Sequence, residues 1–270
     1  MREANVIQTA SEPLPRGDRI ANALARLVYR RAERVIAVSE AVKEDVIARL
    51  GVPAERVTVA HNPVVSPALQ ALAAEPSGHP WLGDQPDVPV VLAAGRLARA
   101  KGFDILLAAF AQVATQREAR LVILGEGKER KALQAQAQAL GIADRVDLPG
   151  FRDNPFSYMR EASLFVLSSR WEGLPNTLIQ AMACGTPVIS TDCPGGSAEI
   201  LEEGRWGALV ASEDPDALAA AMLRCLEKTE PGSDRSPPPA RRAADFSEAA
   251  AMARYREVLG LTLQYEIATA

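Results

Sequence analysis

Two cationic side chains flank the turn between an apolar run and a helix-like segment. In AAGRLARAKGFD, Gly95 ends the apolar run, and Arg96 and Lys101 follow it. Arginine offers a planar fork of N–H donors and lysine a compact charge, and both suit phosphate oxygens. The unpaired N–H groups at a helix start attract the same anions. The pattern favours a diphosphate site, although two solvated loop charges explain most isolated pairs of this kind.

A carboxylate precedes a second predicted helix in the segment SSRWEGLPNTLIQAMACGTPVIST. Glu172 stands at the end of a predicted strand, and the helix begins a few residues later. There the carboxylate can accept hydrogen bonds from sugar hydroxyls while the free N–H groups of the helix hold phosphate. An acidic residue favoured by the helix dipole is the alternative explanation for Glu172 taken alone.

Two further loops carry weaker signals. In DLPGFRDNP, Gly150 and Phe151 follow a strand and can offer backbone groups and a ring to a nucleobase, or they form a turn with a buried ring. In STDCPGGSAEIL, Gly195 and Gly196 permit close backbone approach to a ligand. An ordinary loop, with Glu199 serving the first turn of its helix, explains that segment equally well.

Strands and helices alternate between residues 89 and 228, which predicts an α/β, doubly wound Rossmann-like parallel sheet. Ligands of such sheets bind at the carboxyl ends of the strands, so the four loops are expected to meet at one edge. The predicted strands are VPVVLAAG, ARLVILGEG, RVDLPG, SLFVLSS, TPVIST and WGALVA; the predicted helices are 103–113, 128–140, 155–161, PNTLIQAMACG, GSAEILEEG and PDALAAAMLRCLEK.

Four regions make up the predicted domain organisation. Residues 1–63 contain a helix–strand–helix–strand piece, including a helix over 41–50, that is too short to cover a parallel sheet on both faces. It resembles the end of a domain. Residues 64–88 are rich in proline and predict a linker. Residues 89–228 form the ligand-binding domain, and 229–270 a spacer followed by a helix over 247–265.

Composition excludes several classes of protein. A formal charge of −4 argues against a general nucleic-acid binder, and no apolar run reaches the roughly 18 residues of a membrane span. Three cysteines without metal-ligand spacing fit a reduced, cytoplasmic compartment. A basic stretch leaves two interpretations open, a solvated helix face or peripheral contact with the inner membrane surface; its arginines are 16, 19, 26, 30, 31 and 34.

Taken together, the loops resemble glycosyltransferase family 4, the large retaining group with the GT-B fold. The resemblance runs from about Arg34 to Glu227 and rests on IAVSEAVKEDV, VAHNPV, GRLARAKGFDILLAAFA, LVILGEG, VDLPGF and EGLPNTLIQAMACGTPVIST. It implies transfer of a hexose from a nucleoside diphosphate sugar, such as a UDP-sugar, to a glycan or lipid-linked acceptor, with retention of configuration and without a metal or other cofactor.

The resemblance also implies roles for single residues. Arg96 and Lys101 would hold the donor diphosphate. Glu172, as the catalytic residue, would contact the transferred sugar. The remaining donor contacts that it implies are Gly150, Phe151, Gly173, Leu174 and Gln180.

Two departures from the family pattern bear on activity. The family has a second Glu eight positions after the first, at the ribose diol, where this chain has Gln180. An amide accepts hydrogen bonds at only one end, so we expect weaker or re-oriented ribose binding. The glycine-rich loop that opens the family's N-terminal domain is missing. A binding domain that is inactive without a further domain is therefore the alternative function, and gene fragment, truncation or partner subunit all remain open.

Other patterns are given structural explanations. GEG at 125–127 resembles a dinucleotide loop, but Arg130 occupies the third glycine position, which disfavours a nicotinamide dehydrogenase. Asp214-Pro215-Asp216 has the form of a metal-binding motif, but it opens a helix, so capping by Asp214 is preferred. His61 and His79 are interpreted as structural residues, and Cys184 as a small core residue.

Overall fold

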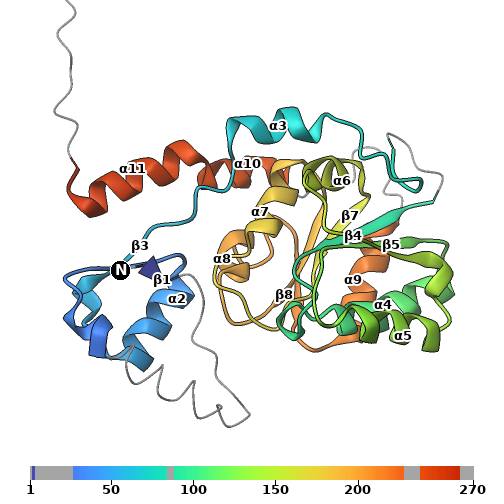
Figure 1. The fold of residues 1–270 in the computed structure, drawn as a ribbon, viewed down its shortest axis with the longest axis horizontal. Helices are drawn as coiled ribbons and strands as arrows, with labels where there is room; N and C mark the ends of the chain where they lie inside the picture. The colour runs from blue at the N-terminus through green and yellow to red at the C-terminus, as the bar shows by residue number, and fades with distance from the viewer. Residues whose placement is uncertain (1, 4–26, 84–87, 228–237, 262–270) are drawn as a thin grey trace, which may run out of the picture.

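The structure is a computed structural model that describes residues 2–3, 27–83, 88–227 and 238–261. Its larger sheet has six strands, all parallel, in the order β6-β5-β4-β7-β8-β9. The chain starts in the middle of this sheet, builds one half outward and returns to build the other (Figure 1). The doubly wound sheet is confirmed, with β4 Val90–Ala94, β5 Arg120–Leu124, β6 Val146–Gly150, β7 Leu164–Leu167, β8 Val188–Asp192 and β9 Ala208–Ala211.

In the described part of the chain, helices cover both faces of this sheet. Helices α4, α5 and α9 pack on one face, and α6, α7 and α8 on the other (Figure 1). Their bounds follow the predicted segments closely: α4 Phe103–Gln116, α5 Arg130–Ala139, α6 Pro155–Glu161, α7 Asn176–Ala183, α8 Ser197–Leu201 and α9 Pro215–Leu226.

The central strands are apolar without interruption because both of their faces are buried. In β4, Val91 and Ala93 point into the core beneath α4 and α9, and Leu92 points into the core beneath α6 and α7. Adjacent residues of β7 divide between the two cores in the same way, since Phe165 belongs to one and Val166 to the other. Side chains alternate along a strand, so a helix on each face requires an apolar residue at every position.

The N-terminal segment, residues 27–62, contributes to a second parallel sheet, in the order β1-β2-β3. Helix α2 follows β2 and passes into a π-helical turn, η1, which ends at Gly51 with φ 64°. The sequence predicted one α-helix here; the change to π hydrogen bonding was not predicted. Residues 27–31 are helical and correspond to the first helix of the predicted helix–strand–helix–strand piece; residues 4–26 lie outside the described residues. The bounds are β1 Arg2–Glu3, β2 Val35–Ala37, β3 Val57–Val59, α2 Glu40–Asp45, η1 Val46–Leu50 and η2 Ala54–Arg56.

The predicted linker contains a helix that the sequence did not predict. Helix α3 (Pro67–Ala73) begins with proline in its first turn and packs against α6, with Leu69 fully buried. This helix has about two turns and few large apolar residues, so its sequence shows no helical periodicity. The helix is recognised only from its packing in the structure.

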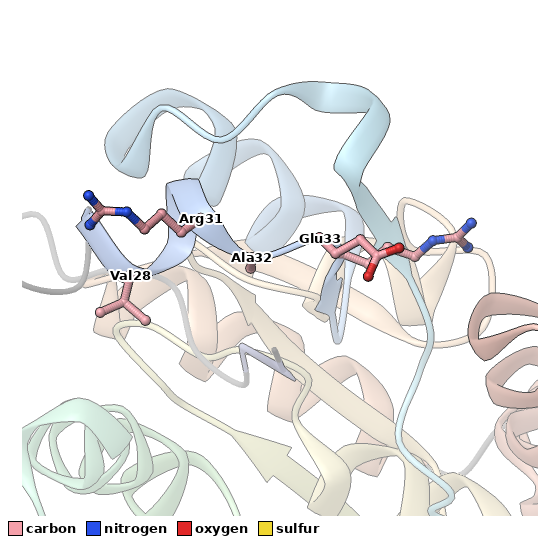
Figure 2. Close-up of a pocket in the computed structure, with 5 residues that line it drawn as sticks. Val28, Arg31, Ala32 and Glu33 are labelled. Atoms are coloured by element: carbon pink, nitrogen blue, oxygen red, sulfur yellow. The ribbon is translucent and has the colours of Figure 1, made fainter.

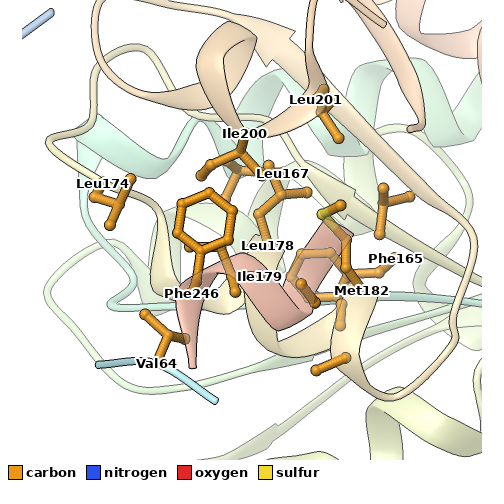
Figure 3. Close-up of a cluster of buried hydrophobic side chains, with 14 of the residues drawn as sticks. Val64, Phe165, Leu167, Leu174, Leu178, Ile179, Met182, Ile200, Leu201 and Phe246 are labelled. Carbon is orange, nitrogen blue, oxygen red and sulfur yellow. The ribbon is translucent and has the colours of Figure 1, made fainter. Parts of the chain in front are cut away.

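The chain ends by returning across the molecule. Helix α10 (Pro239–Ala243) begins inside the predicted spacer and packs on α7, and the turn η5 (Ala244–Phe246) follows it. The Phe246 ring lies among Val64, Leu178 and Ile200 (Figure 3).

Helix α11 (Glu248–Leu259) then crosses to the N-terminal segment, where Arg254 Nε donates to the Val59 carbonyl at 3.1 Å (Figure 1). The prediction that this helix extends to residue 265 is wrong, because Gly260 ends it with φ 66°. Among the residues described, no helix is long and apolar enough to cross a membrane.

Candidate functional site

Lys101 and Glu172 meet at the carboxyl edge of the six-stranded sheet. Lys101 ends the turn η3 (Arg99–Lys101) after β4, and its Nζ lies 2.5 Å from Glu172 Oε1. Ser169 Oγ donates to the same oxygen at 2.6 Å. The Glu172 side chain is 9% exposed, so this carboxylate keeps both partners in a largely dry environment. Glu172 lies in the loop between β7 and α7 and not at the strand end that the sequence suggested.

The two loops that carry this pair are in direct contact. Ser168 Oγ donates to the Lys101 carbonyl at 2.9 Å. Gly102 adopts φ 60°, and a Cβ atom on it would lie 2.0 Å from the Ser168 carbonyl oxygen. Only glycine satisfies both the left-handed backbone and this close approach. The turn that presents Lys101 is therefore fixed against the loop that presents Glu172.

Arg170 ties the same loops together through its side chain. Its guanidinium donates to both carboxylate oxygens of Asp104 at 2.7 Å, to Glu213 Oε1 at 2.5 Å and to the Arg99 carbonyl at 2.9 Å. The hydrogen bond from Arg170 is the largest cause that holds the pKa of Asp104 below its usual range. Arg170 was not predicted as a site residue, although it lies in the loop that follows the buried strand β7.

A hollow of about 380 Å³ opens beside the Lys101–Glu172 pair. Its walls are mostly apolar, with the guanidinium-bearing Arg96 and Arg152, the carboxylate of Glu126 and the ring of Phe151 among them. Phe151 is 68% exposed, which rules out the buried-ring interpretation. The other lining residues are Ala94, Gly95, Leu124, Gly125, Pro155, Met159 and Thr177.

Gly95 connects the hollow to the ion pair. A Cβ atom built on Gly95 would lie 3.4 Å from Cδ and Cε of Lys101, so the lysine stem passes directly over this glycine. Gly95 itself lines the hollow next to Arg96. The structure thus brings Arg96, Phe151, Lys101 and Glu172 to one region of the sheet edge.

Gln180 lies on α7 and is half-buried. Within the described part of the chain, its side chain makes no hydrogen bond. It stands three residues after Thr177, which lines the hollow, so the two share a helix face. Gln180 itself does not line the hollow.

Three other residues that were predicted to contact the donor are held in place by the fold. Leu174 is buried in the core, and the Gly173 carbonyl accepts from the Gly196 amide at 2.9 Å. The Gly173 carbonyl is thus engaged within the protein, and its backbone N–H is the group that it could offer to a ligand. At the end of β6, the Gly150 carbonyl accepts from the Gly125 amide at 2.9 Å.

The loop of Gly195 and Gly196 approaches the backbone of another loop of the protein closely. A Cβ atom on Gly195 would lie 2.4 Å from the Glu172 carbonyl oxygen. Glu199 lies in the first turn of α8, as expected, and its carboxylate also accepts from the Glu40 amide of α2 at 2.9 Å and contacts His61 Nε2 at 2.6 Å. The carboxylate of Glu199 therefore also joins the C-terminal domain to the N-terminal segment, a contact that the sequence did not predict.

The structural interpretations of other motifs hold. Asp214 caps α9 by accepting from the Ala217 amide at 2.9 Å, as predicted. His79 is buried and its Nε2 lies 2.9 Å from Asp147 Oδ2. Burial raises the pKa of Cys184 to about 12.

A second hollow, of about 450 Å³, lies on the N-terminal segment (Figure 2). Val28, Arg31, Ala32, Glu33 and Arg34 line it, and none of the predicted donor contacts does. Two arginines of the basic stretch instead support the fold: Arg30 Nε donates to the Leu50 carbonyl at 3.1 Å, and Arg34 to that of Val258 at 2.8 Å. Residues 16, 19 and 26 of the stretch lie outside the described residues.

Comparison with known families gives two matches. Residues 88–228 match the family model described as glycosyl transferases group 1, and residues 8–66 match that of glycosyltransferase family 4.

Individual relatives agree with these matches. A D-inositol 3-phosphate glycosyltransferase of Thermobispora bispora is 31% identical over 239 residues, which are 84% of this chain and 55% of the relative. The N-acetylgalactosamine-N,N'-diacetylbacillosaminyl-diphospho-undecaprenol 4-alpha-N-acetylgalactosaminyltransferase of Campylobacter jejuni is 28% identical over 204 residues, 76% of this chain and 53% of the relative. The chain spans about half the length of these two relatives.

Among solved structures, Anabaena HepE in complex with UDP superimposes with a TM-score of 0.76 at 25% sequence identity. The match covers 96% of this chain and 71% of HepE.

Proposed function

This chain belongs to the group 1 glycosyltransferases, and we propose that it binds a nucleoside diphosphate sugar where Lys101 and Glu172 meet beside the hollow lined by Arg96 and Phe151. In the complete protein, this site would transfer the sugar to an acceptor with retention of configuration. The observation that carries the proposal is the Lys101–Glu172 pair, which sets a cation for phosphate next to a carboxylate for sugar hydroxyls.

The charges of the site suit departure of a nucleoside diphosphate. As the bond between the anomeric carbon and the phosphate oxygen breaks, negative charge grows on that oxygen, and Arg96 and Lys101 stabilise it. The acceptor oxygen then bonds to the anomeric carbon on the same face, and its proton passes to the departing phosphate. Glu172 orients the sugar through its hydroxyls, so the chain contributes positioning and electrostatics. This route uses no metal, and chelation with EDTA should leave donor binding unchanged.

Relatives guide the choice of donor and acceptor. HepE was solved with UDP, and the name of the Campylobacter jejuni relative includes a diphospho-undecaprenol carrier. We therefore propose a UDP-sugar as donor and a glycan or lipid-linked acceptor. The reaction would take place in the cytoplasm, with peripheral contact at the inner membrane surface.

Binding without transfer is the second candidate function. Gln180 favours it, because an amide at the position of the family's second carboxylate accepts fewer hydrogen bonds from a ribose diol. Transferase assays on the complete protein separate the two functions, since a binding domain alone would form no glycosidic bond.

A thermal-shift screen tests donor binding. UDP, GDP, ADP and their sugars are compared with NADH at equal concentrations. We expect at least one nucleoside diphosphate sugar to raise the melting temperature and NADH to leave it unchanged. Stabilisation by NADH alone would overturn the proposal.

A further inference from the structure

A buried hydroxyl of the N-terminal segment reaches the loop that carries Glu172. Ser39 follows β2 and is fully buried, and its Oγ donates to the Gly173 carbonyl at 3.0 Å. The same oxygen accepts from the Val42 amide at 3.3 Å and so caps α2. One side chain thus links the start of a helix to the residue directly after Glu172.

The Glu172 loop also rests on the loop of residues 194–196. Glu172 N donates to the Pro194 carbonyl, and Gly196 N donates to the Gly173 carbonyl, each at 2.9 Å. The Gly173 carbonyl therefore has two donors, one from its own domain and one from Ser39. These contacts fix the backbone from which the Glu172 carboxylate extends.

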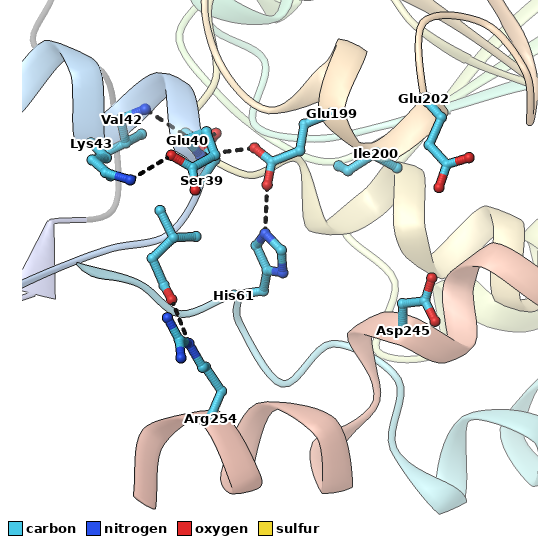
Figure 4. Close-up of polar contacts among 12 residues, drawn as sticks. Ser39, Glu40, Val42, Lys43, His61, Glu199, Ile200, Glu202, Asp245 and Arg254 are labelled. Carbon is cyan, nitrogen blue, oxygen red and sulfur yellow. Dashed lines mark hydrogen bonds and ion pairs between the residues drawn. The ribbon is translucent and has the colours of Figure 1, made fainter. Parts of the chain in front are cut away.

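The segment that carries Ser39 is itself fixed to the C-terminal domain. Glu199 accepts from the Glu40 amide through Oε2 and contacts His61 Nε2 through Oε1 (Figure 4). The His61 ring lies 5.0 Å from that of Phe246, centroid to centroid. Burial raises the pKa of Glu199, but His61, the Glu40 amide and Arg242 together hold it below the usual range. Glu199 is therefore an anion at neutral pH and stabilises this docking.

We propose that Ser39 is a positioning residue for Glu172: its hydroxyl holds the Gly173 carbonyl, so the sugar subsite is complete only while residues 35–62 are docked on the C-terminal domain. The inference rests on the proposed function for the role of Glu172. Its direct structural claim, that Ser39 restrains the Glu172 loop, is independent of any nucleotide.

The effect of losing the Ser39–Gly173 hydrogen bond on donor affinity follows from the hydrogen bonds that the Gly173 carbonyl keeps. Without the hydroxyl, the Gly173 carbonyl keeps only the Gly196 amide, and the loop can shift. A typical buried hydrogen bond corresponds to about a three- to tenfold change in an equilibrium constant. We expect that range for nucleoside diphosphate sugar affinity. Affinity for the nucleoside diphosphate alone should change by less than about twofold, because Glu172 contacts the sugar.

The test must separate loss of the loop contact from loss of the helix cap. Ser39→Ala removes both, whereas Ser39→Gly removes the hydroxyl but leaves a residue that is well tolerated at a helix N-cap. Ser247 supplies matched controls, because it caps α11 from the same 3.3 Å distance to the Ala250 amide and has no contact with the Glu172 loop. The variants Ser247→Ala and Ser247→Gly report the cost of capping alone.

Two readouts are taken on each variant. Amide hydrogen exchange at Glu172 and Gly196 reports on the loop without nucleotide, and calorimetry compares UDP with UDP-sugars. We expect faster exchange at both amides in the Ser39 variants and parent rates in the Ser247 variants. Unchanged exchange in folded Ser39→Gly, or an equal change in the Ser247 variants, overturns the inference. If the parent binds no nucleotide, the proposed function fails, and the exchange data still decide whether Ser39 restrains the loop.

Discussion

Lys101 Nζ lies 2.5 Å from Glu172 Oε1, so the cation assigned to phosphate and the carboxylate assigned to sugar neutralise each other. A diphosphate that binds to Lys101 must share it with Glu172 and come close to a like charge. Removing the carboxylate charge should release the lysine to the phosphate.

Glu172→Gln should therefore strengthen binding of a nucleoside diphosphate that lacks a sugar, by about two- to tenfold, roughly one hydrogen bond. The same variant should lose sugar transfer in the complete protein. Calorimetry with UDP and with a UDP-sugar measures both effects on one preparation. Weaker UDP binding by Glu172→Gln would show that the carboxylate does not compete for Lys101.

Arg96→Ala and Lys101→Ala should each weaken nucleotide binding by about 1.5–3 kcal/mol, as expected for a lost hydrogen bond to a charged group. Lys131→Ala is the matched control, since Lys131 is an exposed cation on α5 away from the hollow. Titration with UDP, GDP and ADP provides the measurement. Parent affinity for all three nucleotides in both variants would contradict the phosphate assignment.

Gln180→Glu should strengthen nucleotide binding by about 0.5–1.5 kcal/mol, because a carboxylate accepts from both ribose hydroxyls. Repulsion from the diphosphate limits the gain. A 2′-deoxy nucleotide should abolish most of it, and the two proteins with two nucleotides form a double-mutant cycle. An equal change for ribose and deoxyribose would mean that residue 180 does not contact the sugar.

Asp104 gives a prediction for the pH dependence of stability. Its pKa is lowered in the folded state, mainly by Arg170, so the contact stabilises the fold above the unfolded pKa of about 3.9 and is lost as pH falls through the folded pKa. Asp104→Asn should cost roughly 0.5–1 kcal/mol at pH 7, because half of this side chain is exposed.

The difference between Asp104→Asn and the parent should shrink as pH falls below the unfolded pKa of about 3.9 and through the lowered pKa of folded Asp104. Urea unfolding at several pH values measures it. Asp144→Asn, which changes an exposed carboxylate in η4 (Ala143–Arg145), is the control. A difference that is constant from pH 7 to pH 3 would rule out the ionised Asp104–Arg170 contact as its source.

The elements of the C-terminal domain were predictable because their patterns are local. Strands buried on both faces are continuous apolar runs, and α6 begins at Pro155 and ends at Glu161 as predicted. Family membership was also visible, since the Arg96 and Lys101 segment and the Glu172 segment are long and specific.

What the sequence could not supply were contacts between distant segments. Ser39 and Gly173 are 134 positions apart, and Glu199 lies 159 positions from the Glu40 amide that it caps. A serine before a helix predicts a cap, and an acid in a first turn predicts a dipole interaction. Neither pattern indicates that the second partner lies in another part of the fold. The place of Arg170 after a buried strand was a signal in the sequence, but its contacts with Asp104 and Glu213 were not predictable.

Two segments of the chain connect the N-terminal segment to the C-terminal domain, and backbone hydrogen bonds join these two segments to each other. The amides of Val64 and Val65 donate to the Phe246 carbonyl, and Glu248 N donates to the Val65 carbonyl at 3.1 Å. A single flexible crossing would permit rotation and twist about any axis. Two parallel crossings that are bonded side by side resist twist and leave bending about one axis as the easiest motion. Any opening of the molecule should therefore be a rotation about a single axis. Cutting either of the two connecting segments would permit rotation about further axes.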